Sequence, residues 1–563
     1  MEVFGADLRS LAVFRIALAI LVLLSLADRA ADLSAHYSDE GVLPRPTLLT
    51  EVLDPWQLSL NVMNGKPLFQ ALVFGVAALA ALALLLGYRT RLATVITWVT
   101  VVSIALRNPL VSGSEAVLLS LLLFWAMFLP LGAHWSVSRA LKVAPPRGVS
   151  MRFLSMATVG LFLQIAFMYW FTAILKSGRE WRVDGTALYY ALSYDQYAKP
   201  FGTYLLQFPE LLEALTFATL VLEAFGPFLL FCPVLTGPVR TGAVLAFMSF
   251  HSGIWLTMSI GMYPWIGALC MVCFLPGWFW DKALPKLRGA FPGQPTITQR
   301  HLRRARALVQ AYLLLPLRAP LFLPGAIARR SPSVEYGDDH DQPESPTTNT
   351  PPAPPTEQGE SGSAMAPERG TRQGGAGASE PAVMLRSSLA TNLLAAFFLL
   401  YVFCWNLASV SEFTMPERIA PLGYLLGLGQ EWNMFAPAPT RSDYWHVIPG
   451  TLRGGQQVDL MALTRDDYHP REGVSWEKPQ YVRGIYKNGQ WQGYLENLVS
   501  FEEYANLRRD FNRYVCQEWN ARHTGVEQLV SFQMTYMLDE TQPDYQPSTP
   551  QKVVLWEHNC FES

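Results

Sequence analysis

Long apolar stretches recur along this chain and alternate with short polar connections. A helix needs about 20 predominantly apolar residues to cross a bilayer. Nine stretches approach this length if the uncharged run 241–280 is divided at Gly261 and Pro264. They are 11–27, 67–88, 92–107, 116–133, 153–175, 212–236, 239–259, 262–280 and 387–411. The pattern predicts a multi-pass α-helical membrane bundle of about nine spans.

Basic residues gather in alternate connections, as they do in loops that stay in the cytoplasm. They are Arg89, Arg91, Arg139, Lys142, Arg147, Arg152, Arg240 and ten Lys or Arg within 282–330. This bias predicts a cytoplasmic amino terminus. We expect the loops 28–66 and 176–211, and everything after residue 411, to lie outside.

Composition agrees with a membrane protein, since 51% of the residues are hydrophobic and 16% are charged. Residues 331–382 differ, with nine prolines and almost no large apolar side chain. Such a segment cannot bury enough apolar surface to fold, so we expect a disordered linker. Before it, 308–328 is apolar but interrupted by prolines, which favours an interfacial helix. The expected division is 1–281 (a bundle of eight spans), 282–330 (basic, cytoplasmic or interfacial), 331–382 (linker), 383–411 (ninth span) and 412–563.

The last of these ranges changes to short alternating runs with turn residues between them, which are typical of strands. It predicts a hairpin within 445–460, a second hairpin within 481–494 around Lys487-Asn-Gly489, a helix at 501–521, and strands at 532–537 and 552–556. We therefore expect an extracytoplasmic α+β, β-rich domain. Cys516 and Cys560 fall within it, and an oxidising compartment makes a disulfide between them plausible.

Several function classes find no support in the sequence. The histidines near the carboxyl end match no zinc-ligand spacing, and no phosphate-binding loop or serine-nucleophile motif occurs. Membrane topology and attraction to anionic lipid explain the basic cluster at 282–330, so nucleic-acid binding is not indicated. We predict no metal site.

Ionisable residues within or beside the apolar stretches are the candidates for function, because they are costly there and usually face the bundle interior. Lys176 follows the uncharged run Phe153–Leu175, and a desolvated lysine can serve as a base. A lysine at the end of a span more often extends to the lipid headgroups. The others are Arg15, Glu115, Glu223 and His251. Arg15 could equally form a carboxylate pair that locks two helices, and His251 could be a buried histidine satisfied by one hydrogen bond.

Four sequence features together carry a family resemblance. They are Leu11-Ala-Val-Phe-Arg15 through Asp28, the spacing of Lys176 and Trp181, Glu223 before Phe225-Gly-Pro-Phe-Leu-Leu-Phe231, and Phe250-His251 leading to Ser259-Ile-Gly-Met-Tyr-Pro264. With them, residues 8–280 resemble the vitamin K-dependent gamma-glutamyl carboxylase and its bacterial relatives with the HTTM (horizontally transferred transmembrane) domain. The resemblance implies a bacterial inner-membrane protein.

It also implies a chemistry. In the carboxylase a lysine after the fifth span deprotonates the reduced quinone, and reaction with oxygen then gives a strong base that acts on glutamate before carbon dioxide is added. Lys176 matches that lysine. Where the carboxylase has a functional histidine, the segment 108–115 has none, and Glu115 is the polar candidate.

Two functions remain open. In the first, Lys176 and His251 are catalytic, and Glu223, Arg15, Glu115, Trp181 and Tyr263 bind the substrate. The cofactor is then a reduced, vitamin K-like quinone, and the partners are membrane lipid and an extracytoplasmic protein or peptide. In the second, the bundle is a non-enzymatic scaffold that holds lipid or a partner protein. A transporter is less supported, because no inverted repeat is apparent. The first function requires Lys176, Glu223 and His251 around one apolar cavity.

Overall fold

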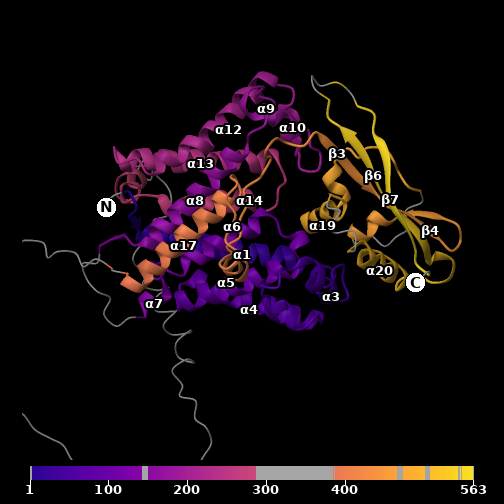
Figure 1. Ribbon diagram of the computed structural model, residues 1–563, viewed down its shortest axis with the longest axis horizontal. Helices are drawn as coiled ribbons and strands as arrows, with labels where there is room; N and C mark the ends of the chain where they lie inside the picture. The colour runs from indigo at the N-terminus through magenta and orange to yellow at the C-terminus, as the bar shows by residue number, and fades with distance from the viewer. Residues whose placement is uncertain are drawn as a thin grey trace, which may run out of the picture. The chain divides into compact units, whose positions relative to one another are not determined.

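A computed structural model describes residues 3–141, 150–286, 385, 387–465, 473–500, 507–542, 546 and 548–561 (Figure 1). The expected interfacial helix (308–328) and linker (331–382) lie outside these residues. Met1–Pro295 and Ala382–Ser563 belong to one compact unit, so the carboxyl-terminal region packs with the helices.

Helices occupy all nine predicted ranges. Six of those described are long and apolar enough to span a membrane: α1 (Leu8–Ala30), α4 (Pro67–Leu86), α5 (Thr90–Arg107), α8 (Met156–Leu175), α12 (Pro209–Leu230) and α17 (Leu389–Ala408). A bent pair, Tyr263–Phe274 and Phe279–Lys286, would make a seventh. The remaining predicted ranges hold α6 (Ser114–Ala126) and α13 (Thr236–Thr257). The expected nine spans are therefore not confirmed by length and composition.

Shorter elements connect these helices. They are α2 (Leu33–Tyr37), α3 (Arg45–Thr47), α7 (Val137–Ala140), α9 (Arg179–Arg182), α10 (Ala187–Ser193), α11 (Pro200–Leu205), and the strands β1 (Ala6–Asp7) and β2 (Arg152–Phe153). Because β1 pairs with β2, α1 and α8 begin side by side. Ser155 and Thr158 form a capping box at the start of α8, with each side chain accepting a bond from the other residue's backbone N–H.

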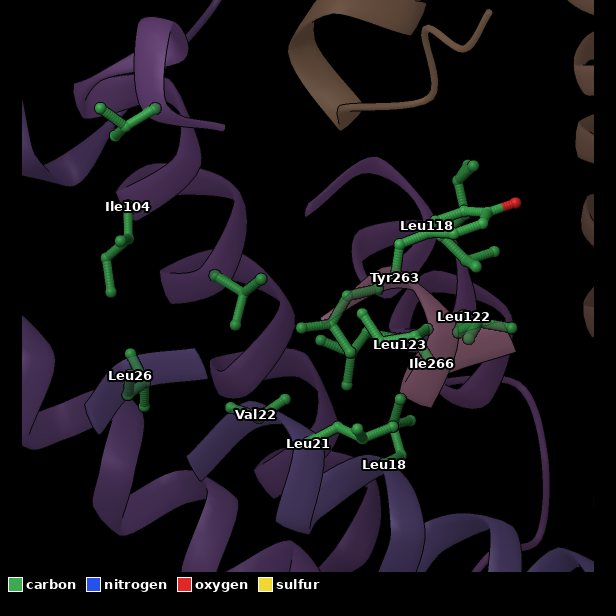
Figure 2. Close-up of a cluster of buried hydrophobic side chains, with 14 of the residues drawn as sticks. Leu18, Leu21, Val22, Leu26, Ile104, Leu118, Leu122, Leu123, Tyr263 and Ile266 are labelled. Atoms are coloured by element: carbon green, nitrogen blue, oxygen red, sulfur yellow. The ribbon is translucent and has the colours of Figure 1, made fainter. Parts of the chain in front are cut away.

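Apolar side chains fill the space between the helices, and Figure 2 shows part of this core. There, Leu18, Leu21, Val22 and Leu26 of α1 lie with Leu118, Leu122 and Leu123 of α6 and Ile266 of α14 (Tyr263–Cys270). In lipid, helices associate through close packing and polar contacts, since lipid tails are as apolar as leucine. Fit between side chains therefore holds the bundle together.

The break predicted at Gly261 and Pro264 is confirmed. α13 ends at Thr257, Gly261 has a positive φ of 63°, and Pro264 lies in the first turn of α14. Two backbone groups of Ser259 in the break have partners elsewhere in the chain: its N–H donates to the Tyr197 carbonyl (2.7 Å) and its carbonyl accepts from Arg483 (3.1 Å).

The carboxyl-terminal region contains a five-stranded antiparallel sheet. Its strands are β3 (Ser442–Val447), β4 (Pro449–Leu452), β5 (Gln457–Asp459), β6 (Leu529–Glu540) and β7 (Gln551–Asn559). The pairing of β4 with β5 confirms the first predicted hairpin. β6 pairs with β3, β4 and β7, so the predicted later strands are also confirmed.

The second predicted hairpin is wrong. Residues around Asn488 begin a helix, α19 (Gly489–Ser500), instead of turning between strands. The Asn488 side chain accepts bonds from the backbone N–H groups of Gln490 and Trp491, so it caps that helix. α20 (Leu507–Asn520) lies within the predicted helix, and its Cys516 forms the predicted disulfide with Cys560. α19 also rests on the bundle, since Asn497 donates to the Leu110 carbonyl at 2.7 Å.

A segment after α17 returns among the helices, although everything after residue 411 was expected outside. α18 (Ala420–Leu426) starts beside the middle of α17, where the Tyr401 hydroxyl donates to the Ile419 carbonyl. Gln430 then accepts from Gln164 in α8 (2.7 Å). Gln164 lies 11 residues before the end of α8, roughly 16 Å along the helix. Pro437 is back at that end, where its carbonyl accepts from Gly178. We call residues 420–437 the returning segment.

The returning segment should depend on its buried amides. The Gln430 carbonyl accepts from both Gln164 and Trp432, so Gln430→Leu leaves two buried donors unpaired. We expect a loss of about 1–3 kcal/mol in unfolding free energy, visible as a lower unfolding temperature in detergent. The exposed Gln207→Leu, a matched control, should change little. An unaltered Gln430→Leu protein would show that the amide contact is unimportant.

Candidate functional site

Lys176 lies at the carboxyl end of α8 in a buried ion pair. Its Nζ is 2.5 Å from Oε2 of Glu223 on α12, and the two side chains are only 5% and 6% exposed. The Trp181 ring lies 4.7 Å from the same ammonium, which is a cation–π distance. Lys176 therefore does not extend to the headgroups. Its ammonium is stabilised by a carboxylate, so a free desolvated amine is not what the fold presents.

The loop after α8 is fixed by the returning segment. Trp181 donates from its indole N–H to the Phe435 carbonyl at 2.9 Å. Arg182 donates to the Lys176 carbonyl at 2.8 Å, which satisfies a backbone group at the helix end. The position of Trp181 over the ammonium thus depends on residues about 250 positions later in the chain.

His251 belongs to a second group of buried polar side chains. Its Nε2 is 2.7 Å from the Tyr169 hydroxyl, and its ring lies 5.9 Å from the ring of Tyr263. Gly267 of α14 makes room for the imidazole, because a Cβ there would lie 2.2 Å from its Cε1. The other ring nitrogen, Nδ1, is buried without a hydrogen-bond partner among the described residues. Its hydrogen-bonding capacity is therefore unused among the described residues.

Tyr169 connects the two groups, and the sequence analysis did not single it out. It lies seven residues before Lys176, which places both on one face of α8. Tyr263 also reaches α8, because its hydroxyl is 3.5 Å from the Met168 sulfur. Four helices thus pair Lys176 with Glu223 and, about two turns earlier along α8, place Tyr169 with His251 and Tyr263. We call these two groups together the buried polar site. The seven-residue spacing was the only sequence signal for Tyr169.

Arg15 and Glu115 lie apart from this site. Arg15 is near the start of α1 and donates to the carbonyls of Leu131 and Trp135, whereas Lys176 follows the far end of the neighbouring α8. The alternative of an Arg15–carboxylate pair is wrong among the described residues, because backbone carbonyls in the connection between α6 and α7, and that of Leu85 in α4, take its hydrogen bonds. Glu115 instead faces Arg29 at 3.9 Å.

The sequence analysis also did not identify Arg483 as a residue that supports the site. Through Ser259, it holds the break between the helices that carry His251 and Tyr263. A lone arginine in a polar region far along the chain gave no sequence signal for this role. Among the residues that the structure describes, no three His, Cys, Asp or Glu side chains gather to hold a metal ion.

Two titratable groups outside the spans lie where the carboxyl-terminal region meets the loops. Burial lowers the pKa of His36 to about 4; its ring packs 4.6 Å from that of Trp491. Burial, together with nearby Asp195, raises the pKa of Asp443 to about 7, against the opposing effect of Lys478. The protonation of His36 and Asp443 can therefore affect the packing of the carboxyl-terminal region against these loops.

Comparison with known proteins gives one match, to the HTTM domain over residues 5–278. These residues match the HTTM family model, and the matched region is called the HTTM domain below. No curated protein and no solved structure matches the chain. Lys176, Glu223, His251 and Tyr263 all lie within the HTTM domain, while Gln430 and Arg483, which support them or their neighbours, lie outside it. The resemblance noted in the sequence is therefore shown at the level of the HTTM domain.

Breaking the ion pair should be costly, because a buried charge would lose its partner. Lys176→Met should lower the unfolding free energy by about 3–5 kcal/mol, and Lys176→Met/Glu223→Leu by less. Thermal unfolding of the purified protein measures both. Arg179→Met is a matched control, since it removes an exposed pair with Asp184 and should cost at most about 1 kcal/mol. Equal losses in the single and double variants would contradict a coupled pair.

Acid should destabilise the fold through His36. The unfolded chain takes up a proton on this residue near pH 6.5, and the folded protein only near pH 4. Its contribution to stability is therefore present above about pH 6.5 and is lost as the pH falls to about 4. Asp443 acts oppositely, because its folded form binds a proton first. His36→Phe should reduce the acid-induced fall in unfolding temperature; an unchanged pH profile would exclude this role.

Proposed function

We propose that the HTTM domain binds a reduced quinone, or another lipid-soluble phenol, at the buried polar site and removes a proton from it. HTTM domains occur in vitamin K-dependent carboxylase-type membrane proteins, and the proposal extends that chemistry to this chain. The observation that carries it is the Lys176–Glu223 pair on the same helix face as the Tyr169–His251 contact.

The residues present offer polar and aromatic contacts to such a ligand, although neither the hollow beside Arg29 nor the one beside Glu431 is lined by Lys176, Glu223 or His251. The site lies among apolar helices, as a lipid-soluble molecule requires. His251 Nδ1 is a buried polar atom with no described partner, and Trp181 and Tyr263 supply aromatic surfaces. A bound reduced quinone would supply the acidic hydroxyl and, with oxygen, the epoxidase or carboxylase-type chemistry that the resemblance implies.

The ion pair acts as one proton acceptor. Glu223 Oε2 takes up the proton, while the Lys176 ammonium stays charged and turns to the anionic oxygen that results. No charge is created or lost in this transfer, and the low dielectric of the site strengthens the new contact. His251 and Tyr169 orient the ligand through Nδ1 and the hydroxyl. In this step Glu223 is the base, and Lys176 is the electrostatic partner of the anion.

The wider arrangement is also part of the proposal. We place the protein in the bacterial inner membrane with nine spans, a cytoplasmic amino terminus and an extracytoplasmic sheet region that admits a protein or peptide. The packing of α8 with α17 supports this topology. Their starts meet through Met156 and Asn392 and their later parts through Phe171 and Phe403, so they run parallel, as the fifth and ninth spans must.

One observation favours the alternative that the bundle is a non-enzymatic scaffold. The ion pair joins α8 to α12, and a contact of this kind can lock helices without any turnover. The two functions differ in what reduced quinones do to the purified protein.

The test supplies purified full-length protein with reduced quinones and oxygen and follows quinone oxidation and epoxide by chromatography. Lys176→Ala and Glu223→Gln should each lower the rate by about 100-fold or more, since a proton acceptor contributes that much. Arg179→Ala, on the exposed surface nearby, should keep the wild-type rate. Equal rates in all proteins, or no turnover in any, would overturn the enzymatic proposal and favour the scaffold.

A further inference from the structure

A hollow of about 730 Å³ opens beside the carboxyl ends of α8 and α17. One wall comes from α8, through Ile174 and Leu175; another follows α17, through Val410 and Glu412; the third is the returning segment, which contributes Glu431. Leu175 and Ser177 line it on either side of Lys176, whose own side chain points to Glu223 instead. The hollow is therefore separate from the buried polar site.

Its position matches the level of lipid headgroups. Two parallel membrane-spanning helices end at the hollow, and a span ends where hydrocarbon gives way to headgroups. Exposed apolar side chains lead toward it along both helices: Ile174 is 50% exposed, Leu400 62% and Phe403 40%. A molecule in the hollow can thus continue as an apolar chain along this helix surface.

Its charge is negative. Glu412 and Glu431 line it, and no lysine or arginine does. Neither carboxylate forms an ion pair with a residue that the structure describes; Glu431 accepts one hydrogen bond, from Asn433 at 3.3 Å. Arg182, which donates to the Ile174 carbonyl, is outside the lining. Two carboxylates at a membrane boundary repel anionic lipids and attract a cation.

We propose that this hollow binds the headgroup of a phospholipid that carries an ammonium group, with its acyl chains along α8 and α17. Glu412 and Glu431 contact the ammonium, and Ile174, Leu175 and Val410 contact the lipid backbone. A soluble cation would leave the apolar wall uncovered. An anionic lipid would bring its phosphate near two carboxylates with no ammonium to offset the repulsion. This binding does not depend on any reaction at Lys176.

The test measures lipid binding to the full-length protein in detergent, by native mass spectrometry and by thermal unfolding. The lipids are phosphatidylethanolamine and, for comparison, phosphatidylglycerol with the same chains. Phosphatidylethanolamine should bind more tightly and raise the unfolding temperature. Glu412→Gln/Glu431→Gln should weaken its binding by about tenfold, the change expected when two partly exposed charge contacts are lost. Glu40→Gln, at an exposed glutamate elsewhere, should bind as the wild type does.

Three results would overturn the proposal. The first is equal binding of phosphatidylglycerol to the wild type, because the headgroup charge would then be irrelevant. The second is a double variant that keeps the preference. The third is free ethanolamine or a basic peptide that binds as tightly as the lipid with the same dependence on both glutamates, because the occupant would then be a soluble cation or a protein segment.

Discussion

Within a bilayer, every charge and every freed backbone group must find its partner inside the protein, because lipid offers none. This constraint accounts for most of the unusual contacts in the bundle. Arg15 donates to carbonyls in the connection between α6 and α7, and Lys176 pairs with Glu223. In the break between α13 and α14, the Ser259 N–H donates to Tyr197 and its carbonyl accepts from Arg483. Each contact joins elements that are far apart in the sequence. The need to pair buried charges and backbone groups therefore also determines which helices are neighbours.

The same constraint ties the carboxyl-terminal region to the HTTM domain. Arg483 reaches the break beside His251, and the returning segment supplies Gln430 to α8 and a carbonyl to Trp181. The sheet region is therefore more than an appendage that follows the last span. It completes the polar contacts of the helices that carry the candidate site, which explains why the two parts form one compact unit.

The buried Lys176–Glu223 ion pair matters both for the stability of the bundle and for the proposed chemistry. Removing either Lys176 or Glu223 leaves the other charge buried without its partner, which is costly. The neighbouring His251 Nδ1, with no described partner, gives the site an unused polar atom. The hollow near Glu412 differs because its charges face outward, where a lipid headgroup can meet them.

Sequence alone located the helices, because a run of about 20 apolar residues is a local property and needs no knowledge of the fold. It also identified the break at Gly261, the cysteine pair and the polar residues worth examining. It failed for residues 481–494, where a single asparagine cap outweighed a turn pattern, and for the returning segment, which is too short to register as a span. Only the tertiary structure decided which carboxylate pairs with Lys176, and that Arg15 pairs with none among the described residues. The reason is that partners in a bundle are determined by how helices pack and not by distance along the chain.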